Sequence, residues 1–381
     1  MKVICHTGTT IDRLARDLKP AETIQRTTVS VYEVPTDFPE SDGTLEWNST
    51  TMVLVELTAG RTRGIGYTYA HASCAAVVQD KLFPLVQQGD AMNLRATWNR
   101  MNNAVRNFGR QGLAATAIAA VDIALWDLKA RLLGLPLVDL LGAVREKIPV
   151  YGSGGFTSYP EKRLRRQFEQ WIAEGITMVK MKVGRDPAAD GARAKAARKA
   201  IDRGTELFVD ANGAYSTKQA LEKAEAFSEH NVSWFEEPVS SDDLDGLQFI
   251  RGRAPAGMEI SAGEYNYDVL QARRMLETRS VDVLQADATR CGITGFLQTA
   301  GLCDAFQVPL SSHTASAIHA HLGCAASRAR HAEYFHDHVR IEQMFFNGAT
   351  TRHDGGFLKP DRSQPGLGLE FKRNDAEKFR I

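Results

Sequence analysis

The feature that most constrains the fold of this chain is a series of charged residues, spaced 23 to 28 residues apart, most of which follow a short apolar run. The series begins with Lys180 and Lys182 and continues with Asp210, Glu236, Glu264, Asp287 and His313. A strand, a loop, a helix and a return loop occupy a comparable length. Charges at the carboxyl ends of successive parallel strands meet at one mouth, where an α/β barrel carries its chemistry. The pattern therefore predicts a (β/α)8 barrel.

The bulk properties allow such a barrel and exclude several classes of protein. At 381 residues the chain exceeds the roughly 250 that a barrel takes, so we expect further domains. The 46 basic and 46 acidic residues leave no basic field for nucleic acid or an anionic membrane. No apolar run reaches the roughly 18 residues of a membrane span, and the first 20 residues are too charged for a signal peptide. The five scattered cysteines, Cys5 among them, form no Cys-x-x-Cys pair, so we expect a reduced, cytoplasmic protein.

The residue pattern changes twice along the chain. Residues 25–69 favour a small antiparallel sheet, interrupted at 35–47 by a polar segment that we interpret as a lid loop. An Ala- and Leu-rich helix is predicted at 112–133. Strand–helix alternation then begins near residue 148, and the last forty residues look irregular. We therefore expect a capping domain at 1–146, a catalytic barrel at 147–339 and a segment at 340–381 that packs back on the first domain.

Three carboxylates, Asp210, Glu236 and Glu264, stand at three successive strand ends. Buried together without a counter-charge they would repel one another strongly. A divalent cation resolves the repulsion, and all-oxygen ligation favours a hard ion, Mg²⁺ above all. In Glu236-Glu237, strand alternation turns only one carboxylate inward, and we assign Glu236 as the ligand.

Lys180 and Lys182 lie two residues apart, so both side chains leave the same face of one strand. The apolar residues that alternate with them pack on helices, which places the lysines inside the barrel rather than on a solvated face. Two neighbouring ammonium groups lower each other's pKa, so we expect one of them to serve as a neutral base near pH 7.

His313 follows a short apolar run, and Asp287 ends the preceding strand. A carboxylate bonded to one imidazole nitrogen fixes the tautomer of the ring and raises its basicity. We therefore interpret the pair as a catalytic dyad. His319 and His321 fall within the following helix pattern and are interpreted as ordinary helix residues.

Further motifs accompany these residues in a fixed order. They are Ala120-Val-Asp-Ile-Ala-Leu-Trp-Asp-Leu-Lys129, Leu140-Leu-Gly142, Val209-Asp-Ala-Asn212, Phe235-Glu-Glu-Pro238, Gly263-Glu264, Asp287 to Arg290, Ser312-His313 and Pro365-Gly-Leu-Gly-Leu-Glu370. Together with the Lys-x-Lys strand, this set resembles the enolase superfamily and, within it, the mandelate racemase subgroup. The resemblance covers nearly the whole chain. It implies an α/β fold, a (β/α)7β TIM-like barrel, with an α+β capping domain formed by the N-terminal region and the C-terminal segment.

The resemblance also implies a reaction. It predicts one Mg²⁺ per active site and removal of the proton α to a substrate carboxylate. By this likeness Lys182 is the base on one face of the substrate, and the His313–Asp287 dyad acts on the other. Lys180 would stabilise charge and tune Lys182.

The resemblance implies roles for several further residues. Asn212 would orient ligands or bind substrate, and Glu333 would hydrogen-bond the substrate carboxylate, although His336 and Asp337 stand close enough in sequence to take that role. Trp47, Tyr67 and Tyr69 are predicted to contact the substrate over the mouth. The chain departs from the subgroup's Arg-x-Gly-Gly pattern at Arg290-Cys-Gly-Ile293, which leaves the pose of Asp287 open.

Several outcomes of the reaction remain open. We favour dehydration of a sugar acid, an aldonate or aldarate, to a 2-keto-3-deoxy acid, which makes the protein a hydro-lyase. The alternative is racemisation or epimerisation of a 2-hydroxy acid, and a second alternative is a non-catalytic binding homologue. A cycloisomerase would be expected to carry lysine in place of His313, and no Gly-x-Gly-x-x-Gly supports a nicotinamide enzyme. We expect a small-molecule carboxylate substrate, no nucleic acid or membrane partner, and a homo-oligomer, either a dimer or an octamer.

Overall fold

The structure, a computed structural model, describes residues 22–349 and 355–381. Cys5 and the charged N-terminal residues that argue against a signal peptide lie outside the described part. The described cysteines, Cys74, Cys291, Cys303 and Cys324, are buried free thiols. None of the helices in the described part is both long and apolar enough to cross a membrane.

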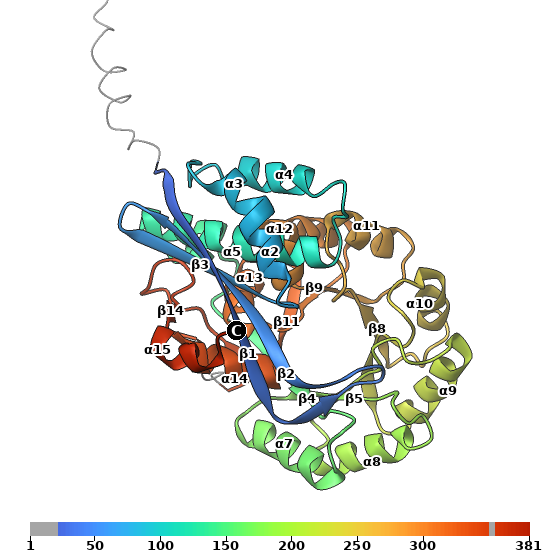
Figure 1. Cartoon of the computed structure of the whole chain (residues 1–381). Helices are drawn as coiled ribbons and strands as arrows, with labels where there is room; N and C mark the ends of the chain where they lie inside the picture. Colours follow the sequence, from blue (N-terminus) through green and yellow to red (C-terminus); the bar gives the residue numbers. More distant parts are fainter. Residues whose placement is uncertain (1–21, 350–354) are drawn as a thin grey trace, which may run out of the picture.

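The centre of the molecule is a closed barrel of eight parallel strands (Figure 1). The strands are β4 (Ile148–Gly154), β5 (Met178–Lys182), β6 (Glu206–Asp210), β7 (Val232–Glu236), β8 (Glu259–Ala262), β9 (Val283–Ala286), β10 (Leu310–Ser312) and β11 (Ala329–Phe335). Each pairs with the next in the chain, and β11 pairs with β4 to close the ring. Their short apolar runs are buried on both faces, as parallel strands require. The predicted barrel is confirmed.

Helices between the strands surround this barrel. They are α7 (Glu161–Ala173), α8 (Asp190–Ala200), α9 (Thr217–Ser228), α10 (Leu244–Arg251), α11 (Val269–Glu277), α12 (Ala288–Phe306) and α13 (Ser316–Ala325). They confirm the strand–helix alternation expected from residue 148 onward. The Asp287 side chain caps the first turn of α12 by accepting from Thr289 N.

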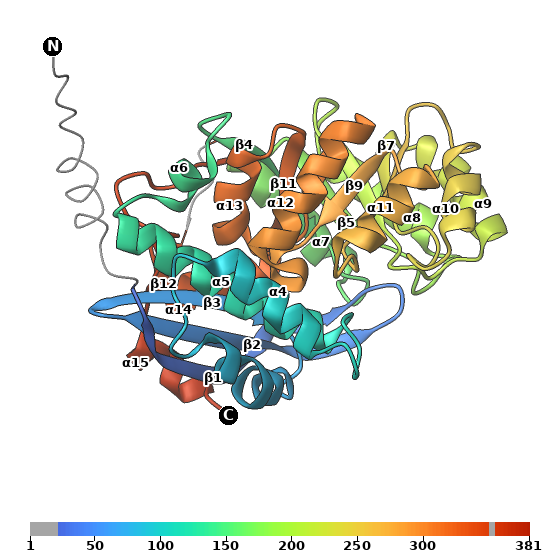
Figure 2. The same ribbon diagram turned by 90° about the horizontal axis from the view of Figure 1, so that it is seen from above.

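A second layer lies across one side of the barrel (Figure 2). Its sheet is antiparallel and contains β1 (Ile24–Ser41), β2 (Glu46–Ala59) and β3 (Thr62–Tyr69). Its helices are α2 (Cys74–Ala76), the π-helix η1 (Val77–Leu82), α3 (Phe83–Val86), α4 (Leu94–Ala104), α5 (Leu113–Leu133) and α6 (Leu137–Leu141). This is the α+β capping region expected from the sequence.

The prediction of a loop at 35–47 is wrong, because most of this segment is strand. β1 continues to Ser41, pairs with β2 through Ser41↔Glu46, and the register shifts between Pro35 and Glu40. Asp42 forms the turn by accepting from the backbone N–H groups of Thr44 and Leu45. The polar composition suggested a loop, but pairing with the opposite strand extends the hairpin over the barrel.

Two glycines let β3 lie directly on α5. A Cβ atom on Gly64 would come 2.5 Å from Leu128 Cβ, and one on Gly66 would come 2.2 Å from the Ala120 carbonyl oxygen. No side chain fits either gap, so glycine is required for this close approach. The contact fixes the capping sheet against the long helix that also packs on α12.

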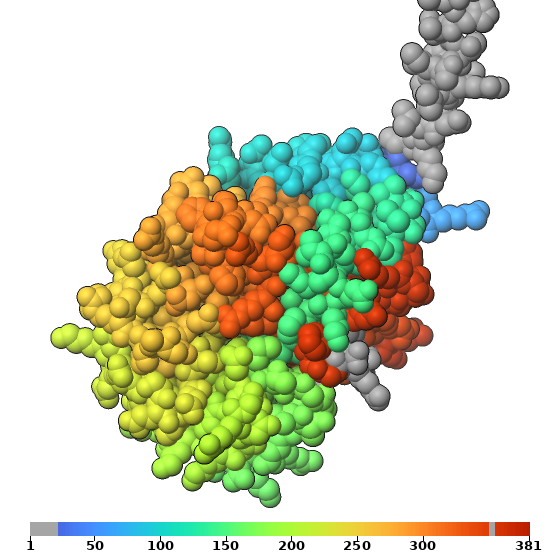
Figure 3. Space-filling view, turned by 180° about the vertical axis from the view of Figure 1, so that it is seen from behind, coloured from blue at the N-terminus to red at the C-terminus, as the bar shows by residue number. Residues whose placement is uncertain are grey.

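The C-terminal part returns to the capping region. It contains α14 (His336–Phe345), β12 (Phe346–Asn347), β13 (Phe357–Leu358), β14 (Glu370–Phe371), α15 (Arg373–Ala376) and the 3₁₀ helix η2 (Glu377–Phe379). Ile381 N donates to Val31 O of β1, and Arg373 pairs with Glu56 of β2 at 2.7 Å. Seen from behind, this segment lies beside the region of α5 and α6 (Figure 3). β13 adds to β4 in antiparallel orientation.

Candidate active site

The predicted metal ligands meet at the carboxyl ends of three neighbouring strands. Asp210 ends β6, Glu236 ends β7, and Glu264 follows β8. One carboxylate oxygen from each lies within 4.8 Å of the other two, and all three side chains are buried. Glu237 is buried as well, but it is not part of this group, in agreement with the choice of Glu236.

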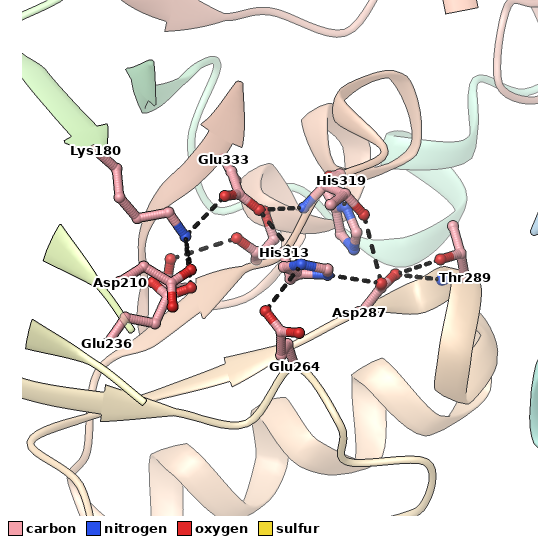
Figure 4. Close-up of polar contacts among 12 residues, drawn as sticks. Lys180, Asp210, Glu236, Glu264, Asp287, Thr289, His313, His319 and Glu333 are labelled. Carbon is pink, nitrogen blue, oxygen red and sulfur yellow. Dashed lines mark hydrogen bonds and ion pairs between the residues drawn. The ribbon is translucent and has the colours of Figure 1, made fainter. Parts of the chain in front are cut away.

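Both lysines of β5 contact this cluster, and Figure 4 shows Lys180 pointing toward its acids. Lys180 Nζ lies 2.5 Å from Glu236 Oε1, 2.8 Å from Glu333 Oε1 and 3.4 Å from Asp210 Oδ2. Lys182 Nζ lies 2.5 Å from Asp210 Oδ2. The prediction that the pair lies inside the barrel is confirmed.

The expected lowering of the lysine pKa values is wrong for this arrangement. Burial lowers the pKa of Lys182, but the adjoining Asp210 carboxylate outweighs both burial and the Lys180 charge, so its pKa is raised. Burial likewise lowers the pKa of Lys180, but the carboxylates of Glu236 and Glu333 outweigh burial and raise it. The acids around the two lysines outweigh the repulsion between the neighbouring ammonium groups.

His313 and Asp287 form the predicted pair. His313 Nδ1 lies 2.9 Å from Asp287 Oδ2, and His313 Nε2 lies 3.1 Å from Glu264 Oε2, on the side of the metal-ligating acids. Burial lowers the pKa of His313, but the nearby carboxylates, Glu264 first, outweigh burial and raise it to about 10. The His313 contact in turn outweighs burial of Asp287 and holds the pKa of that carboxyl well below its usual range.

The local structure explains the pose of Asp287 that the sequence left open. Gly292, the one glycine after Cys291, adopts φ +76° and bends α12. Asp122 of α5 accepts from Thr294 N and Thr294 Oγ1 just beyond that bend, at 2.8 Å each. One glycine is therefore enough to turn the chain, and Asp287 keeps its place at the helix start.

The nearby histidines have structural contacts. His319 Nε2 accepts from Ala288 N at 3.0 Å, and its Nδ1 lies 2.8 Å from Thr314 O. His321 Nδ1 accepts from Val138 N at 3.2 Å. Both are buried in α13, as expected for helix residues without a catalytic position.

Glu333, and not His336, completes the cluster. Glu333 lies on β11, contacts Lys180, and accepts from Thr314 N at 2.8 Å. His336 Nε2 lies 3.2 Å from Asp37 Oδ2 of the hairpin. Asp337 is bonded to Thr50 Oγ1 and paired with Arg340. Glu333 lies on β11 and contacts the cluster, whereas His336 and Asp337 lie beyond the strand in the first turn of α14.

The predicted substrate-binding residues divide into two groups. Asn212 follows the Asp210 strand end with φ +46°, and its Oδ1 is buried without a hydrogen-bond partner. Trp47 stands at the hairpin against Phe156, with ring centroids 5.7 Å apart. Tyr67 is fully buried and its hydroxyl donates to Glu342 at 2.5 Å. The structure therefore does not bring Tyr67 together with the other predicted substrate-binding residues.

Two residues near the cluster were not predicted. His338 of α14 stacks on Tyr69 with centroids 3.5 Å apart, and packing together with the charge of His313 lowers its pKa to about 3. Arg290 pairs with Glu264 at 3.5 Å and with Asp287 at 3.7 Å. Arg290 was visible in the Asp287 motif, whereas His338 sits in a helix pattern that carries no sequence signal for a site.

The residues fit a magnesium ion. The three carboxylates form an all-oxygen set of the kind that Mg²⁺ prefers, and their ligand atoms are close enough to share one ion. Solved structures with magnesium share this fold. The chain superimposes with a TM-score of 0.88 on a racemase from Streptomyces coelicolor A3(2) with bound magnesium, 27% identical over 94% of this chain and all of that one.

Other relatives cover most of the chain. A mandelate racemase/muconate lactonizing enzyme-like protein from Rubrobacter xylanophilus is 52% identical over 94% of this chain and all of that one, with a TM-score of 0.92. A 3,6-anhydro-alpha-L-galactonate cycloisomerase from Streptomyces coelicolor is 30% identical over 92% of this chain and 98% of its own length. An L-talarate/galactarate dehydratase from Salmonella typhimurium is 30% identical over 80% of this chain and 76% of its own length.

Family patterns match both parts of the molecule. Residues 26–142 match the mandelate racemase/muconate lactonizing enzyme N-terminal domain. Residues 163–376 match the enolase C-terminal domain-like family. With its barrel, its capping region and the ordered set of acids, lysines and histidine, this chain belongs to the mandelate racemase/muconate lactonizing enzyme family of the enolase superfamily.

Proposed function

We propose that this protein is a magnesium-dependent hydro-lyase that removes the α-proton of a sugar acid and releases its β-hydroxyl as water. The observation that carries the proposal is the placement of two proton-transfer groups around one acidic cluster. Lys182 contacts Asp210, while His313, held by Asp287, contacts Glu264. In the barrel β5 and β10 are not adjacent, so the two groups approach the cluster from different strands.

We assign the metal-ligand role to the three strand-end acids, Asp210, Glu236 and Glu264. A magnesium ion there supplies positive charge where negative charge develops on the substrate carboxylate. Lys180 adds a fixed cation beside Glu333 at 2.8 Å, in a site from which water is largely excluded.

The proton transfers fall to Lys182 and His313. One of them takes the α-proton as a general base, and the electron pair of that C–H bond moves toward the carboxylate. One protonated residue then delivers a proton to the β-hydroxyl, whose C–O bond breaks to release water. The resulting enol becomes a 2-keto-3-deoxy acid. Asp287 holds the ring of His313 in the orientation that both steps need.

We further propose that Lys182 acts as the base in the loaded enzyme. A lysine accepts a proton only when it is neutral, and in the structure the carboxylate of Asp210 favours the charged form. That carboxylate is also one of the proposed magnesium ligands, so the group that raises the pKa of Lys182 is the group whose charge the ion offsets.

The relatives support a sugar-acid substrate. Those whose names state a dehydratase include L-talarate/galactarate, arabinonate, D-gluconate and L-rhamnonate enzymes. A second candidate is cycloisomerisation, because the relative from Streptomyces coelicolor covered to 98% of its length is named a cycloisomerase. Racemisation or epimerisation of a 2-hydroxy acid uses the same two groups without loss of the hydroxyl.

A substrate screen separates these reactions. Aldonic acids, aldaric acids, and their anhydro and lactone forms are each incubated with the protein and Mg²⁺. A dehydratase releases a 2-keto acid, which semicarbazide detects, whereas a cycloisomerase or racemase yields an isomer without it. EDTA should stop the reaction and added Mg²⁺ restore it. Turnover of an anhydro acid or lactone alone, with no 2-keto acid from any open-chain acid, contradicts the dehydratase proposal.

We also propose the division of the chain into a capping domain at 1–146, a catalytic barrel at 147–339 and a C-terminal segment at 340–381 that completes the cap. The contacts of Arg373 and Ile381 with β1 and β2 support that last assignment. A cytoplasmic homo-oligomer, a dimer or an octamer, remains our proposal for the assembly, to be tested by sedimentation.

A further inference from the structure

A second cluster of potential metal ligands lies away from the catalytic acids, where the β1–β2 hairpin meets the start of α14. One carboxylate oxygen of Asp37, one of Glu40 and a ring nitrogen of His336 all lie within 4.8 Å of one another. Asp37 and Glu40 belong to β1, and His336 is the first residue of α14. Two segments far apart in the chain thus bring three ligand atoms together.

Glu40 supplies independent evidence that this cluster binds something. Its side chain is 0% exposed, and Trp47 Nε1 donates to Oε2 at 2.9 Å. The other oxygen, Oε1, is buried and has no hydrogen-bond partner. Within the described part of the chain no lysine or arginine forms an ion pair with Glu40. Buried carboxylate oxygens are normally paired, so this one calls for a cation or a proton.

The neighbouring charges leave Glu40 uncompensated. Arg163 Nη2 lies 3.1 Å from both oxygens of Asp37, and His336 Nε2 lies 3.2 Å from one of them. These contacts satisfy Asp37, whose oxygens retain further lone pairs for a ligand. Asp337, also buried, is paired with Arg340, so the charge of Arg340 is shared with that acid.

We propose that Asp37, Glu40 and His336 form a second divalent-cation site, distinct from the magnesium ligands. Its donor set differs from that of the catalytic acids, because one imidazole nitrogen joins two carboxylates. Imidazole suits Zn²⁺ and its neighbours in the first transition row, whereas three carboxylates suit Mg²⁺. A cavity of about 340 Å³, lined by Asp37, Arg163 and His336 among others, gives an ion a route from solvent.

An ion at this site joins the hairpin to the barrel. The hairpin already contacts the barrel loops through Ser158 Oγ, which donates to Pro39 O at 2.6 Å, and through Thr157 N, which donates to Ser41 O at 2.8 Å. Ligation by β1 and α14 together adds a contact that depends on the ion. The site therefore controls how readily the hairpin leaves the mouth of the barrel.

The test measures Zn²⁺ binding in a protein whose catalytic acids are disabled. Glu236→Gln with Glu264→Gln removes two ligands of the first site and leaves the second intact. Equilibrium dialysis with elemental analysis should show one tightly bound Zn²⁺ in this double variant. Adding His336→Ala should weaken that binding by more than the roughly 10- to 100-fold that loss of an outer-shell partner causes. Adding His71→Ala, an exposed histidine on the capping region, should not.

A second readout keeps the proposal testable if binding is difficult to count. Amide hydrogen exchange of residues 36–46 in the double variant should slow when Zn²⁺ is added, and His336→Ala should abolish the effect. Thermal melting confirms that each variant is folded; His336 is partly exposed, and its replacement should be tolerated. Absence of Zn²⁺ binding in the folded double variant, or binding that is unchanged by His336→Ala, overturns the site and leaves Glu40 as a protonated acid.

Discussion

At the scale of single residues, the active site contains buried carboxylates whose negative charge the lysines and one proposed Mg²⁺ ion would offset. Glu236→Gln keeps the size of the side chain and removes one of the three converging carboxylates. We expect Mg²⁺ affinity to fall and kcat/KM to drop roughly a thousandfold, or about 4 kcal/mol of transition-state stabilisation. Calorimetric Mg²⁺ titration and turnover measure the two effects, with circular dichroism as the check on folding. Wild-type affinity for Mg²⁺ in this variant would remove Glu236 from the ligand set.

His313 makes the stability of the metal-free protein depend on pH. Its pKa is raised from 6.5 to about 10 in the folded protein, because the carboxylates around it outweigh burial. A raised pKa stabilises the fold fully below about pH 6.5 and loses this contribution as pH rises toward 10. In EDTA, urea unfolding should therefore show wild type and His313→Asn differing most near pH 6 and converging above about pH 10. A difference that grows with pH contradicts the assignment.

At the scale of elements, we expect the β1–β2 hairpin to act as a lid over the site. Its turn lies on the catalytic strand ends: a Cβ on Gly43 would come 2.3 Å from Ala211 O and 2.8 Å from Val183 O. Gly43→Ala should hold the turn away from the barrel and raise KM about tenfold, while the displaced turn lowers the free energy of unfolding by about 1–3 kcal/mol.

The matched control for this prediction is Gly191→Ala. Gly191 lies in α8, where an added Cβ meets nothing within 4 Å, so KM and stability should stay close to wild type. Steady-state kinetics and urea unfolding compare the two variants. A Gly43→Ala protein that melts much earlier but keeps its KM would show that the hairpin is structural rather than a substrate lid.

The barrel and the catalytic cluster were predictable, because both depend on local patterns repeated along the chain. Apolar runs ending in Asp210, Glu236 and Glu264 specify strand ends, and closing the barrel brings those ends together. The hairpin and the direction of the lysine pKa shifts could not be predicted from the sequence. The hairpin depends on pairing with β2, and the pKa values depend on acids from other strands, and both are relations across the fold.

At the scale of the whole molecule, one buried acid ties the capping sheet, the long helix and the C-terminal segment together. Asp127 accepts from Ile65 N at 2.8 Å and Leu367 N at 2.7 Å, and pairs with Arg131 at 2.8 Å. Asp127→Ala leaves the two buried N–H groups without this acceptor and removes one of the partners of Arg131, so we expect a loss of about 3–5 kcal/mol in the free energy of unfolding. Urea unfolding measures it.

Asp139→Ala is the comparison for Asp127. Asp139 pairs with Arg362 at the surface, where removal should cost about 1 kcal/mol or less. Equal losses in the two variants would show that Asp127 does not join the three segments. The sequence places Asp127 on the predicted long helix, but its partners at residues 65 and 367 come from distant parts of the chain and could not be predicted from the motif.

Lys182 and His313 are proposed to serve opposite faces of one substrate carbon, and isotope exchange tests this claim most directly. Once the screen has identified a substrate, its two α-stereoisomers are incubated in deuterium oxide with Mg²⁺ and followed by proton NMR. Lys182→Ala should exchange only the isomer that faces His313, and His313→Asn only the isomer that faces Lys182, even where formation of the 2-keto acid stops. Exchange of both isomers by the His313→Asn protein would contradict the claim, because a second base would then lie elsewhere in the barrel.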